Sequence, residues 1–410
     1  MNRIQRKHYV RGGGLLAVTL AALAAFFALR PPDDPFAAAA VTDPPFEPLT
    51  YAIQAFLWWD GGENGFTLDW VKNMGFTHVK QTFAWEDVEP ARGDWRFGPA
   101  DNLLGQTEAR GLQVIARLSD TPEWARGQQG TAVEAITDTP PADPADYGAY
   151  CGEIATRYRG RIAAYQIWNE PNLSREWGGH PPDAAGYTAL LAACSAAIRA
   201  ADPDAVLISA GLAPTGNTDE RALRDDIYLQ QMYDAGFQQY VDAVGVHAPG
   251  FDAPAVGPDD AEREGRQRWM SFRRVEDLRK IMVRNGDAAR QMAILEVGYT
   301  TDQRNPDYQW FAVSEAEQAE RVAAAYTYAG ENWRPWVGLM SAIYMAKPTW
   351  TEVNEEFWWS FSVPRLDEGY IALRPVVESV ARMPKYCGDV INPAIPPETP
   401  IGSEVANGCR

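Results

Sequence analysis

Positively charged residues are scarce in this chain of 410 residues. It has 37 Lys and Arg against 55 Asp and Glu, which gives a formal net charge of −18 and an isoelectric point near 4.7. Proteins that bind along the phosphates of DNA or RNA need basic patches that displace counterions. The shortage of positive charge therefore excludes nucleic acid as an expected partner.

Metal-binding and nucleotide-binding signatures are missing from the sequence. The chain has 4 His and 4 Cys without a Cys-x-x-Cys pair, so a structural zinc site has no support. Gly61-Gly62, after the first predicted strand, lacks the third glycine and the opening helix of a dinucleotide-binding fingerprint. We expect neither a metal nor an organic cofactor.

The mostly apolar run Leu15–Leu29 follows a basic stretch near the N-terminus. Its length is typical of a signal peptide and falls short of the roughly 20 residues that span a bilayer comfortably. We expect residues 1–40 to be an export signal, with small residues for cleavage at Ala37–Ala40, or else an uncleaved N-terminal membrane anchor. In either case the basic stretch stays inside the cell, so the protein is expected to be extracytoplasmic, secreted or anchored.

The four cysteines suit an oxidising compartment. Cys151 and Cys194 fall on consecutive predicted helices, and Cys387 and Cys409 flank a C-terminal tail rich in Pro and Gly. Two local disulfides are expected, although the sequence leaves their connectivity open. The tail, residues 387–410, is expected to wrap the surface without forming a domain.

Apolar strand-like runs alternate with amphipathic helical stretches from residue 43 onward, which predicts one α/β domain over residues 41–386. Several helices end at a glycine that can adopt a left-handed conformation, namely Gly75, Gly111 and Gly236. Eight strand–helix repeats with right-handed crossovers predict a (β/α)8 TIM barrel, with an open doubly wound sheet as the alternative. The expected strands are Tyr51–Leu57, His78–Phe83, Gln113–Leu118, Tyr165–Trp168, Val206–Ala210, Ala243–His247, Met292–Glu296 and Leu339–Tyr344. The expected helices are Leu68–Met74, Ala100–Arg110, Ala145–Arg157, Ala184–Ala201, Asp225–Ala235, Arg268–Asn285, Glu315–Asn332 and Leu373–Met383.

Long connections follow four of these strands and predict where the site lies. Residues 119–144, 172–183, 248–266 and 345–370 come after the third, fourth, sixth and eighth strands. They should therefore gather at the carboxyl ends of the strands, where barrel enzymes build their sites.

Two glutamates end predicted strands. Glu170 stands in Trp168-Asn169-Glu170-Pro171 after the fourth strand, and Glu296 ends the apolar seventh strand. A lone carboxylate of this kind is most simply a salt-bridged residue at the rim, because an unpaired buried charge costs several kcal/mol. Two of them, at strands four and seven of eight, indicate a shared function.

The pair is the strongest part of a resemblance to clan A of the glycoside hydrolases, over roughly residues 50–385. The sequence looks most like family 39 and its exopolysaccharide-hydrolase relatives, and next most like the cellulase-like enzymes of family 5. Departures are Lys80 where many relatives have Arg, Glu-Val-Gly in strand seven, and the lack of an accessory β-sandwich. Further matching stretches are Lys80–Trp85, Glu89-Pro90, Gly93–Trp95, Thr121–Trp124 and Asp242–His247.

The resemblance implies a retaining glycosidase with Glu170 as acid/base and Glu296 as nucleophile. Carboxyl groups roughly 5–5.5 Å apart leave no room for a water molecule, so one of them attacks the anomeric carbon. We expect the charge of Glu296 and the low dielectric to raise the pKa of Glu170 and keep it protonated. The resemblance also implies that Asn169 contacts the sugar 2-hydroxyl, which requires an irregular strand end before Pro171.

Other candidate substrate-binding residues are His247, which could bind the nucleophile or a hydroxyl, and Lys80, which could contact sugar or form a supporting ion pair. Aromatic rings near the loops could stack on sugar faces, although core packing is the usual role of any one of them. The candidates are Trp58, Trp85, Trp124, Trp177, Tyr299, Tyr344, Trp358 and Trp359, of which Trp358-Trp359 is favoured because adjacent rings in a long loop are hard to bury together.

Together these features predict a monomeric enzyme that cleaves β-linked bonds in an extracellular oligo- or polysaccharide. A catalytically silent carbohydrate-binding barrel is one alternative, which the presence of both glutamates and Asn169 opposes. A transglycosylase that remodels cell-surface glycan is another, and it would use the same carboxylates. Fold alone does not determine the sugar.

Overall fold

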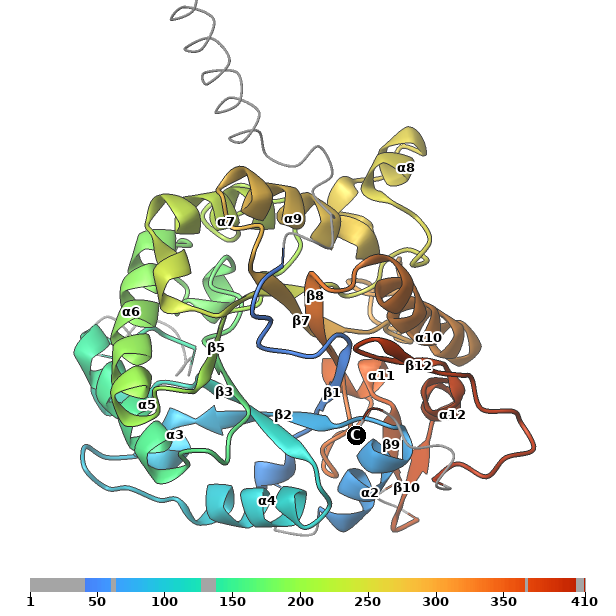
Figure 1. Cartoon of the computed structure of the whole chain (residues 1–410), viewed down its shortest axis with the longest axis horizontal. Helices are drawn as coiled ribbons and strands as arrows, with labels where there is room; N and C mark the ends of the chain where they lie inside the picture. Colours follow the sequence, from blue (N-terminus) through green and yellow to red (C-terminus); the bar gives the residue numbers. More distant parts are fainter. Residues whose placement is uncertain (1–40, 60–63, 127–137, 366–367, 403–408, 410) are drawn as a thin grey trace, which may run out of the picture.

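The computed structural model describes residues 41–59, 64–126, 138–365, 368–402 and 409. Eight parallel strands form a closed barrel in sequence order (Figure 1), and β1 pairs with both β2 and β8. The predicted fold class is confirmed, whereas the predicted export signal lies outside the described residues. The barrel strands are β1 (Thr50–Gln54), β2 (His78–Ala84), β3 (Gln113–Ser119), β4 (Ala164–Ile167), β5 (Val206–Ser209), β6 (Ala243–His247), β7 (Gln291–Val297) and β8 (Val337–Ala342).

Helices surround the barrel and cover its outer side (Figure 1). The predicted helices are present, with one correction at Arg268–Asn285. There the chain forms two short 3-10 turns before α9, because Ser271 is extended and its hydroxyl accepts a hydrogen bond from Arg273 N. The α-helices are α2 (Gly65–Asn73), α3 (Trp85–Val88), α4 (Gly98–Glu108), α5 (Pro144–Arg157), α6 (Ala184–Ala201), α7 (Asp225–Asp234), α8 (Pro258–Arg263), α9 (Val275–Arg284), α10 (Glu315–Asn332), α11 (Glu355–Trp359) and α12 (Pro375–Arg382).

The core has an inner and an outer layer. Inside the barrel lie small and branched side chains such as Ala52, Ile115 and Leu295. The outer layer between strands and helices is much larger and holds most of the buried aromatic rings. The predicted glycine caps also form, with φ of 76° at Gly75, 69° at Gly111 and 79° at Gly236.

Both disulfides are present. Cys151–Cys194 joins α5 to α6, and Cys387–Cys409 ties the tail to the strand pair β11 (Lys385–Cys387) and β12 (Val390–Asn392). Of the helices in the described part of the chain, α6 is apolar and long enough to cross a membrane, but its packing on α5 identifies it as a barrel helix.

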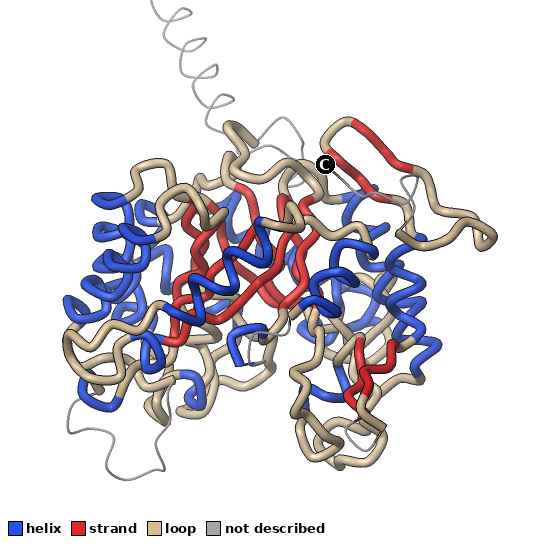
Figure 2. Tube along the Cα trace, turned by 90° about the horizontal axis from the view of Figure 1, so that it is seen from below, coloured by secondary structure: helices blue, strands red, loops and turns tan. Residues whose placement is uncertain are grey.

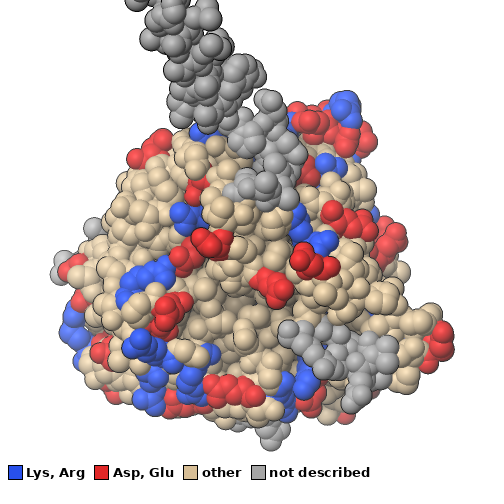
Figure 3. Space-filling view, viewed as in Figure 1, with Lys and Arg blue, Asp and Glu red and all other residues tan. Residues whose placement is uncertain are grey.

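The two ends of the barrel carry different structures. Leu49 N, just before β1, donates to Tyr386 O, so β11–β12 lies at the amino ends of the strands. The pair β9 (Ser362–Arg365) and β10 (Tyr370–Leu373) belongs to the connection after β8 and lies at the other end (Figure 2). Acidic and basic side chains intermingle on the face that Figure 3 shows, so neither sign of charge gathers in a single patch on that face.

Candidate active site

Three ionisable side chains meet at the carboxyl ends of three strands. Glu170 follows β4, His247 ends β6 and Glu296 is the penultimate residue of β7. One ligand atom of each lies within 4.8 Å of the others. The side chains of Glu170 and Glu296 are 12% and 13% exposed, so both are shielded from bulk water but accessible. The structure thus brings the two predicted carboxylates together.

The backbone after β4 is irregular, as the predicted placement of Asn169 requires. Trp168 and Glu170 have φ angles of 71° and 37°, in a region that side chains with a Cβ rarely adopt. Glu170 N donates to Gly211 O at 3.0 Å, which anchors the turn to the segment after β5. Asn169 is 6% exposed, and its amide accepts from Gln166 Nε2 and donates to Glu176, each at 3.3 Å.

His247 lies between the two carboxylates. Its Nδ1 is 2.8 Å from Glu170 Oε1 and 3.6 Å from Glu296 Oε2. The ring packs directly on Gly211, where a Cβ atom would stand 2.1 Å from the imidazole. A glycine at position 211 is therefore needed for the imidazole to reach Glu170.

Lys80 forms an ion pair beneath the site. Its Nζ, fully buried in β2, donates to Leu295 O at 2.8 Å and to Glu296 Oε1 at 3.3 Å. Burial lowers the pKa of Lys80 to about 8, against the opposing effect of the Glu296 charge. Of the two predicted roles for Lys80, the structure shows the supporting ion pair.

The expected rise in the pKa of Glu170 is not found. Burial alone would raise that pKa, but the hydrogen bond and charge of His247, with the charge of Arg175, outweigh burial and lower it to about 2. Arg175 lies 3.4 Å from Glu170 Oε2. The expectation omitted both cations, because a sequence does not show which bases surround a carboxylate.

Four charged residues near the site were missed in the sequence: Arg117, Asp120, Arg175 and Glu176. Burial, with the charge of Glu170, raises the pKa of Glu176 to about 8. Burial also raises the pKa of Asp120 to about 7, against the opposing charge of Arg117. Arg117 was detectable, because it interrupts the apolar strand β3 in the same way that Glu296 ends β7. Arg175 and Glu176 lie in a connection that shows no periodic pattern.

Tyr344 and Trp358 are half-buried. The pKa of Tyr344 is raised well above its usual value by burial and by nearby charges, Glu296 foremost. The centroid of its ring is 5.5 Å from that of Phe56 and 5.9 Å from that of Trp350. Trp358 donates to Glu352 O at 3.1 Å and lies under the guanidinium of Arg304. Its neighbour Trp359 is buried, so adjacent rings in this loop can be buried more fully than expected.

The predictions that Trp85 and Tyr299 bind substrate are wrong. Both are fully buried; Trp85 stacks on Tyr150 in the outer core, and the Tyr299 ring packs on Gly250. Trp58 and Trp177 are also buried. Trp124 is half-buried, but Arg92 covers its ring at 4.3 Å and its indole N–H donates to Glu89 O. These rings belong to the outer core or pack against it. The sequence shows that a ring lies near the end of a strand, but not whether it points to the core or to the substrate.

Glu170, His247 and Glu296 are also side chains that could hold a metal ion. Two cations already face this set, because Lys80 pairs with Glu296 and Arg175 with Glu170. Positive charge that a metal would supply to these carboxylates is thus supplied by the chain itself. The arrangement favours proton transfer and nucleophilic attack by the carboxylates.

No known family model matches the sequence. The fold nevertheless resembles those of several solved glycoside hydrolases. A family 39 glycoside hydrolase from Bacteroides cellulosilyticus is 17% identical, with a TM-score of 0.59 over 85% of this chain and 65% of that one. A monomeric β-xylosidase from Caulobacter crescentus is 16% identical, with a TM-score of 0.57 over 81% of this chain and 67% of that one.

The particular resemblance within this class is to family 39. A third structure, the family 39 enzyme from Xanthomonas axonopodis, is 15% identical, with a TM-score of 0.57 over 83% of this chain and 67% of that one. The chain spans about two thirds of the length of these proteins. The fold that the sequence motifs implied is therefore confirmed.

Proposed function

We propose that the protein is a retaining glycosidase that cleaves β-linked bonds in an extracellular oligo- or polysaccharide. The observation that carries this proposal is the approach of the Glu170 and Glu296 carboxyl oxygens to within 4.8 Å of each other. Inverting enzymes hold their carboxyl groups roughly 6.5–9.5 Å apart to admit a water molecule, whereas retaining enzymes hold them about 5–5.5 Å apart. The separation here supports direct attack by a carboxylate.

Glu296 is the nucleophile in this proposal. Lys80 holds one of its oxygens at 3.3 Å, which favours the negative charge that attack requires. A carboxylate oxygen of Glu296 bonds to the anomeric carbon as the bond to the leaving oxygen breaks. Lys80 also fixes the orientation of the carboxylate, since it is anchored to Leu295 O on the same strand.

Glu170 is the acid and then the base. Its Oε1 lies 2.8 Å from His247 Nδ1, a hydrogen-bonding distance over which a proton can pass between the two side chains. As charge develops on the leaving oxygen, that proton passes through Glu170 to the leaving group. In the second step Glu170 takes a proton from water, the water oxygen bonds to the anomeric carbon, and the ester bond to Glu296 breaks.

Asn169 and Tyr344 are the proposed sugar contacts nearest the reacting carbon. The role of Asn169 at the 2-hydroxyl comes from the resemblance to clan A, and the irregular backbone at Trp168 and Glu170 supports it. Tyr344 lies on the connection just after β8, near enough to Glu296 for that charge to contribute to the raised pKa of Tyr344. The remaining half-buried candidates, Trp124 and Trp358, lie farther out among loop residues.

The comparisons support β-linked sugars as the substrate class. Beyond family 39, the fold resembles that of an exo-β-1,4-mannosidase from an Opitutaceae bacterium, with 14% identity and a TM-score of 0.53 over 83% of this chain and 61% of that one. Two disulfides support an extracytoplasmic location, as the N-terminal sequence does.

The test is a pair of isosteric substitutions assayed on aryl β-glycosides. Glu170→Gln and Glu296→Gln should fold normally and lose activity, by about 10²–10⁴-fold for the acid/base and more for the nucleophile. Azide should restore turnover to Glu296→Ala, because a small anion fits the space left by the carboxylate. Wild-type turnover in both Gln variants would refute the proposal.

A further inference from the structure

An aromatic cluster lies on the same face as the two carboxylates, formed by Phe251, Trp269, Trp310 and Phe311. Phe251 belongs to the connection after β6, and Trp310 and Phe311 belong to the connection after β7. The ring centroids of Phe251 and Trp310 are 5.8 Å apart with an interplanar angle of 9°, and those of Phe311 and Trp310 are 4.6 Å apart. The cluster stands at the carboxyl ends of the strands, although no sequence pattern singled it out.

Trp310 is 54% exposed, which is unusual for a large apolar ring whose neighbours are also aromatic. Its indole N–H donates to Asp307 O at 2.9 Å, and that of Trp269 donates to Gln267 Oε1 at 3.1 Å. Phe311 extends the cluster inward to buried Trp359, 6.1 Å away. The exposed ring is therefore oriented before any ligand arrives, which reduces the entropy lost on binding.

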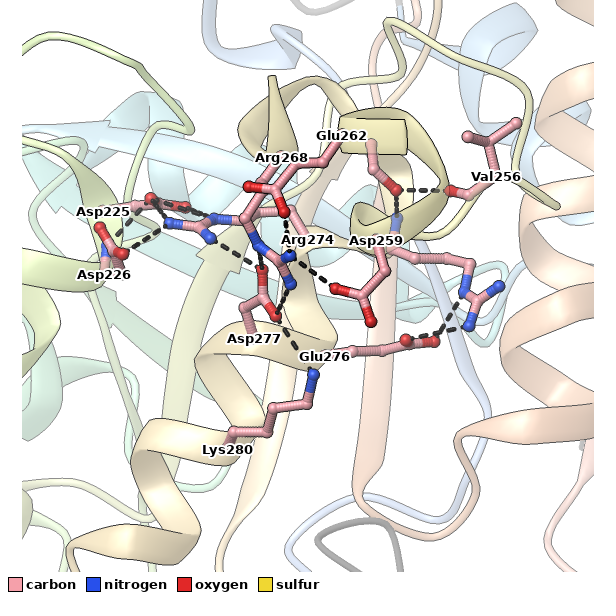
Figure 4. Close-up of polar contacts among 12 residues, drawn as sticks. Asp225, Asp226, Val256, Asp259, Glu262, Arg268, Arg274, Glu276, Asp277 and Lys280 are labelled. Carbon is pink, nitrogen blue, oxygen red and sulfur yellow. Dashed lines mark hydrogen bonds and ion pairs between the residues drawn. The ribbon is translucent and has the colours of Figure 1, made fainter. Parts of the chain in front are cut away.

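An ion-pair network holds the segment that carries Trp269. Its neighbour Arg268 lies between Asp259 and Glu262 of α8 and Asp277 of α9 (Figure 4), with contacts of 2.6, 2.9 and 2.8 Å. Three carboxylates around one guanidinium fix the short turn Arg268–Met270 against both helices. Trp269 in turn contacts Phe251 at 5.0 Å.

Two polar contacts lie between the cluster and the acid/base, Tyr308 with Glu355 and Arg175 with Glu170. The ring centroids of Tyr308 and Phe311 are 6.0 Å apart. The Tyr308 hydroxyl donates a hydrogen bond to Glu355 Oε2 at 2.6 Å. Burial would lower the pKa of Arg175, but the nearby negative charges of Glu170 and Glu355 outweigh burial and raise it. Because Arg175 pairs at 3.4 Å with Glu170, the group that faces the leaving group in the proposed mechanism, we assign the cluster to the leaving-group side.

We propose that Phe251, Trp269 and Trp310 form a remote subsite that binds a sugar ring of a β-linked glycan on the leaving-group side. This inference rests on the proposed function and adds that the substrate is a chain several units long. A pyranose ring presents an apolar C–H face that stacks on indole, and a rigid exposed ring flanked by polar backbone matches that chemistry. On this proposal, a substrate of one or two units leaves the cluster unoccupied.

The binding test uses the Glu170→Gln/Glu296→Gln protein, which holds glycan without cleaving it. Titration calorimetry compares β-1,4-linked xylo-, gluco- and manno-oligosaccharides of two and six units. Trp310→Ala should weaken the tightest hexasaccharide by about 5- to 10-fold and leave the disaccharide unchanged, in line with the usual contribution of an aromatic contact. Trp310→Phe should retain most of the binding.

Ile391→Ala is the matched control, because Ile391 is 53% exposed on β12 at the opposite end of the barrel. It should leave hexasaccharide binding unchanged. Equal binding by Trp310→Ala and its parent, or no binding of any hexasaccharide, overturns the subsite. So does a Trp310→Ala variant that alters only self-association in sedimentation, since the cluster would then contact a second copy. If the proposed function fails, the Glu→Gln substitutions leave aryl glycoside hydrolysis unchanged, which is a separate result.

Discussion

At the scale of single residues, the site depends on how its carboxylates are paired. Both acids face the His247 imidazole, which is nearer Glu170, but Lys80 pairs with Glu296 and Arg175 with Glu170, so the two acids have different cationic partners although they lie within 4.8 Å of each other. Different partners give two carboxyl groups different pKa values, which allows one to act as the nucleophile and the other to carry the proton. The charge state of Lys80, whose pKa burial lowers to about 8, should therefore limit activity on the alkaline side.

The first prediction concerns Lys80, whose pKa burial lowers to about 8. Lys80 is charged below that pH and neutral above it, so the cation facing Glu296 is lost as pH rises. Activity should fall as pH rises through about 8. In Lys80→Arg, a guanidinium stays charged well above that range, and the alkaline limb of kcat/KM should move upward by more than one pH unit.

The control for Lys80 is Glu176→Gln, because the pKa of Glu176 is also raised to about 8. That variant should keep an alkaline limb near the wild-type position. Lys80→Met should lose activity at all pH values, since it leaves Glu296 without its partner. An unchanged alkaline limb in an active, folded Lys80→Arg variant would show that another group sets the limb.

Residue chemistry was only partly predictable from the sequence. Glu170 and Glu296 stood out because ionisable groups at the ends of buried strands need a reason to be there. Lys80 and His247 were also candidates from their strand positions, but the sequence did not show that His247 lies nearer Glu170 than Glu296. Arg175 was missed because it reaches Glu170 from the connection after β4. Trp85 and Tyr299 were misplaced for a related reason: a ring near a strand end can point to the outer core as easily as to the substrate.

At the scale of elements, strands and helices followed from periodicity and glycine caps. All eight strands and most helix boundaries were predicted to within a few residues, because buried parallel strands and amphipathic helices have different hydrophobic periods. The exception is Arg268–Asn285, where Ser271 breaks the predicted helix near its start and caps a second 3-10 turn. Its apolar pattern continues through this break, so periodicity alone gave one helix where there are three segments.

The second prediction tests how β5 and β6 position His247. A Cβ at Gly211 would lie 2.1 Å from the His247 ring, and a buried ring cannot move aside without leaving Glu170. Gly211→Ala should lower kcat by roughly 10²-fold, the scale of a lost proton-transfer contact, and destabilise the fold by about 1–3 kcal/mol through overpacking. Steady-state kinetics and thermal unfolding measure both.

Gly105→Ala is the control for that variant, because a Cβ at this position on α4 meets no atom within 4 Å. It should keep wild-type kcat and gain about 0.5–1 kcal/mol of stability, since alanine favours helix over glycine. If Gly211→Ala kept full activity, contact between His247 and Glu170 would be unnecessary for turnover.

At the scale of the whole molecule, closure of the barrel brings the two acids together. Glu170 and Glu296 lie far apart in the sequence and on strands that are not neighbours, and only the ring β1–β8 places them on one side of a shared space. The sequence predicted this closure from eight repeats without showing the separation of the carboxyl groups. That separation supports a retaining mechanism.

The stereochemistry of the first product tests the central claim most directly. Proton NMR of the anomeric signals, recorded in the first minutes of hydrolysis of an aryl β-glycoside that the protein cleaves, distinguishes the two outcomes before mutarotation. Two successive displacements at carboxyl groups this close predict that the β-anomer appears first and the α-anomer grows in later. An initial α-anomer would mean that water attacks directly, which would contradict the assignment of Glu296 as nucleophile.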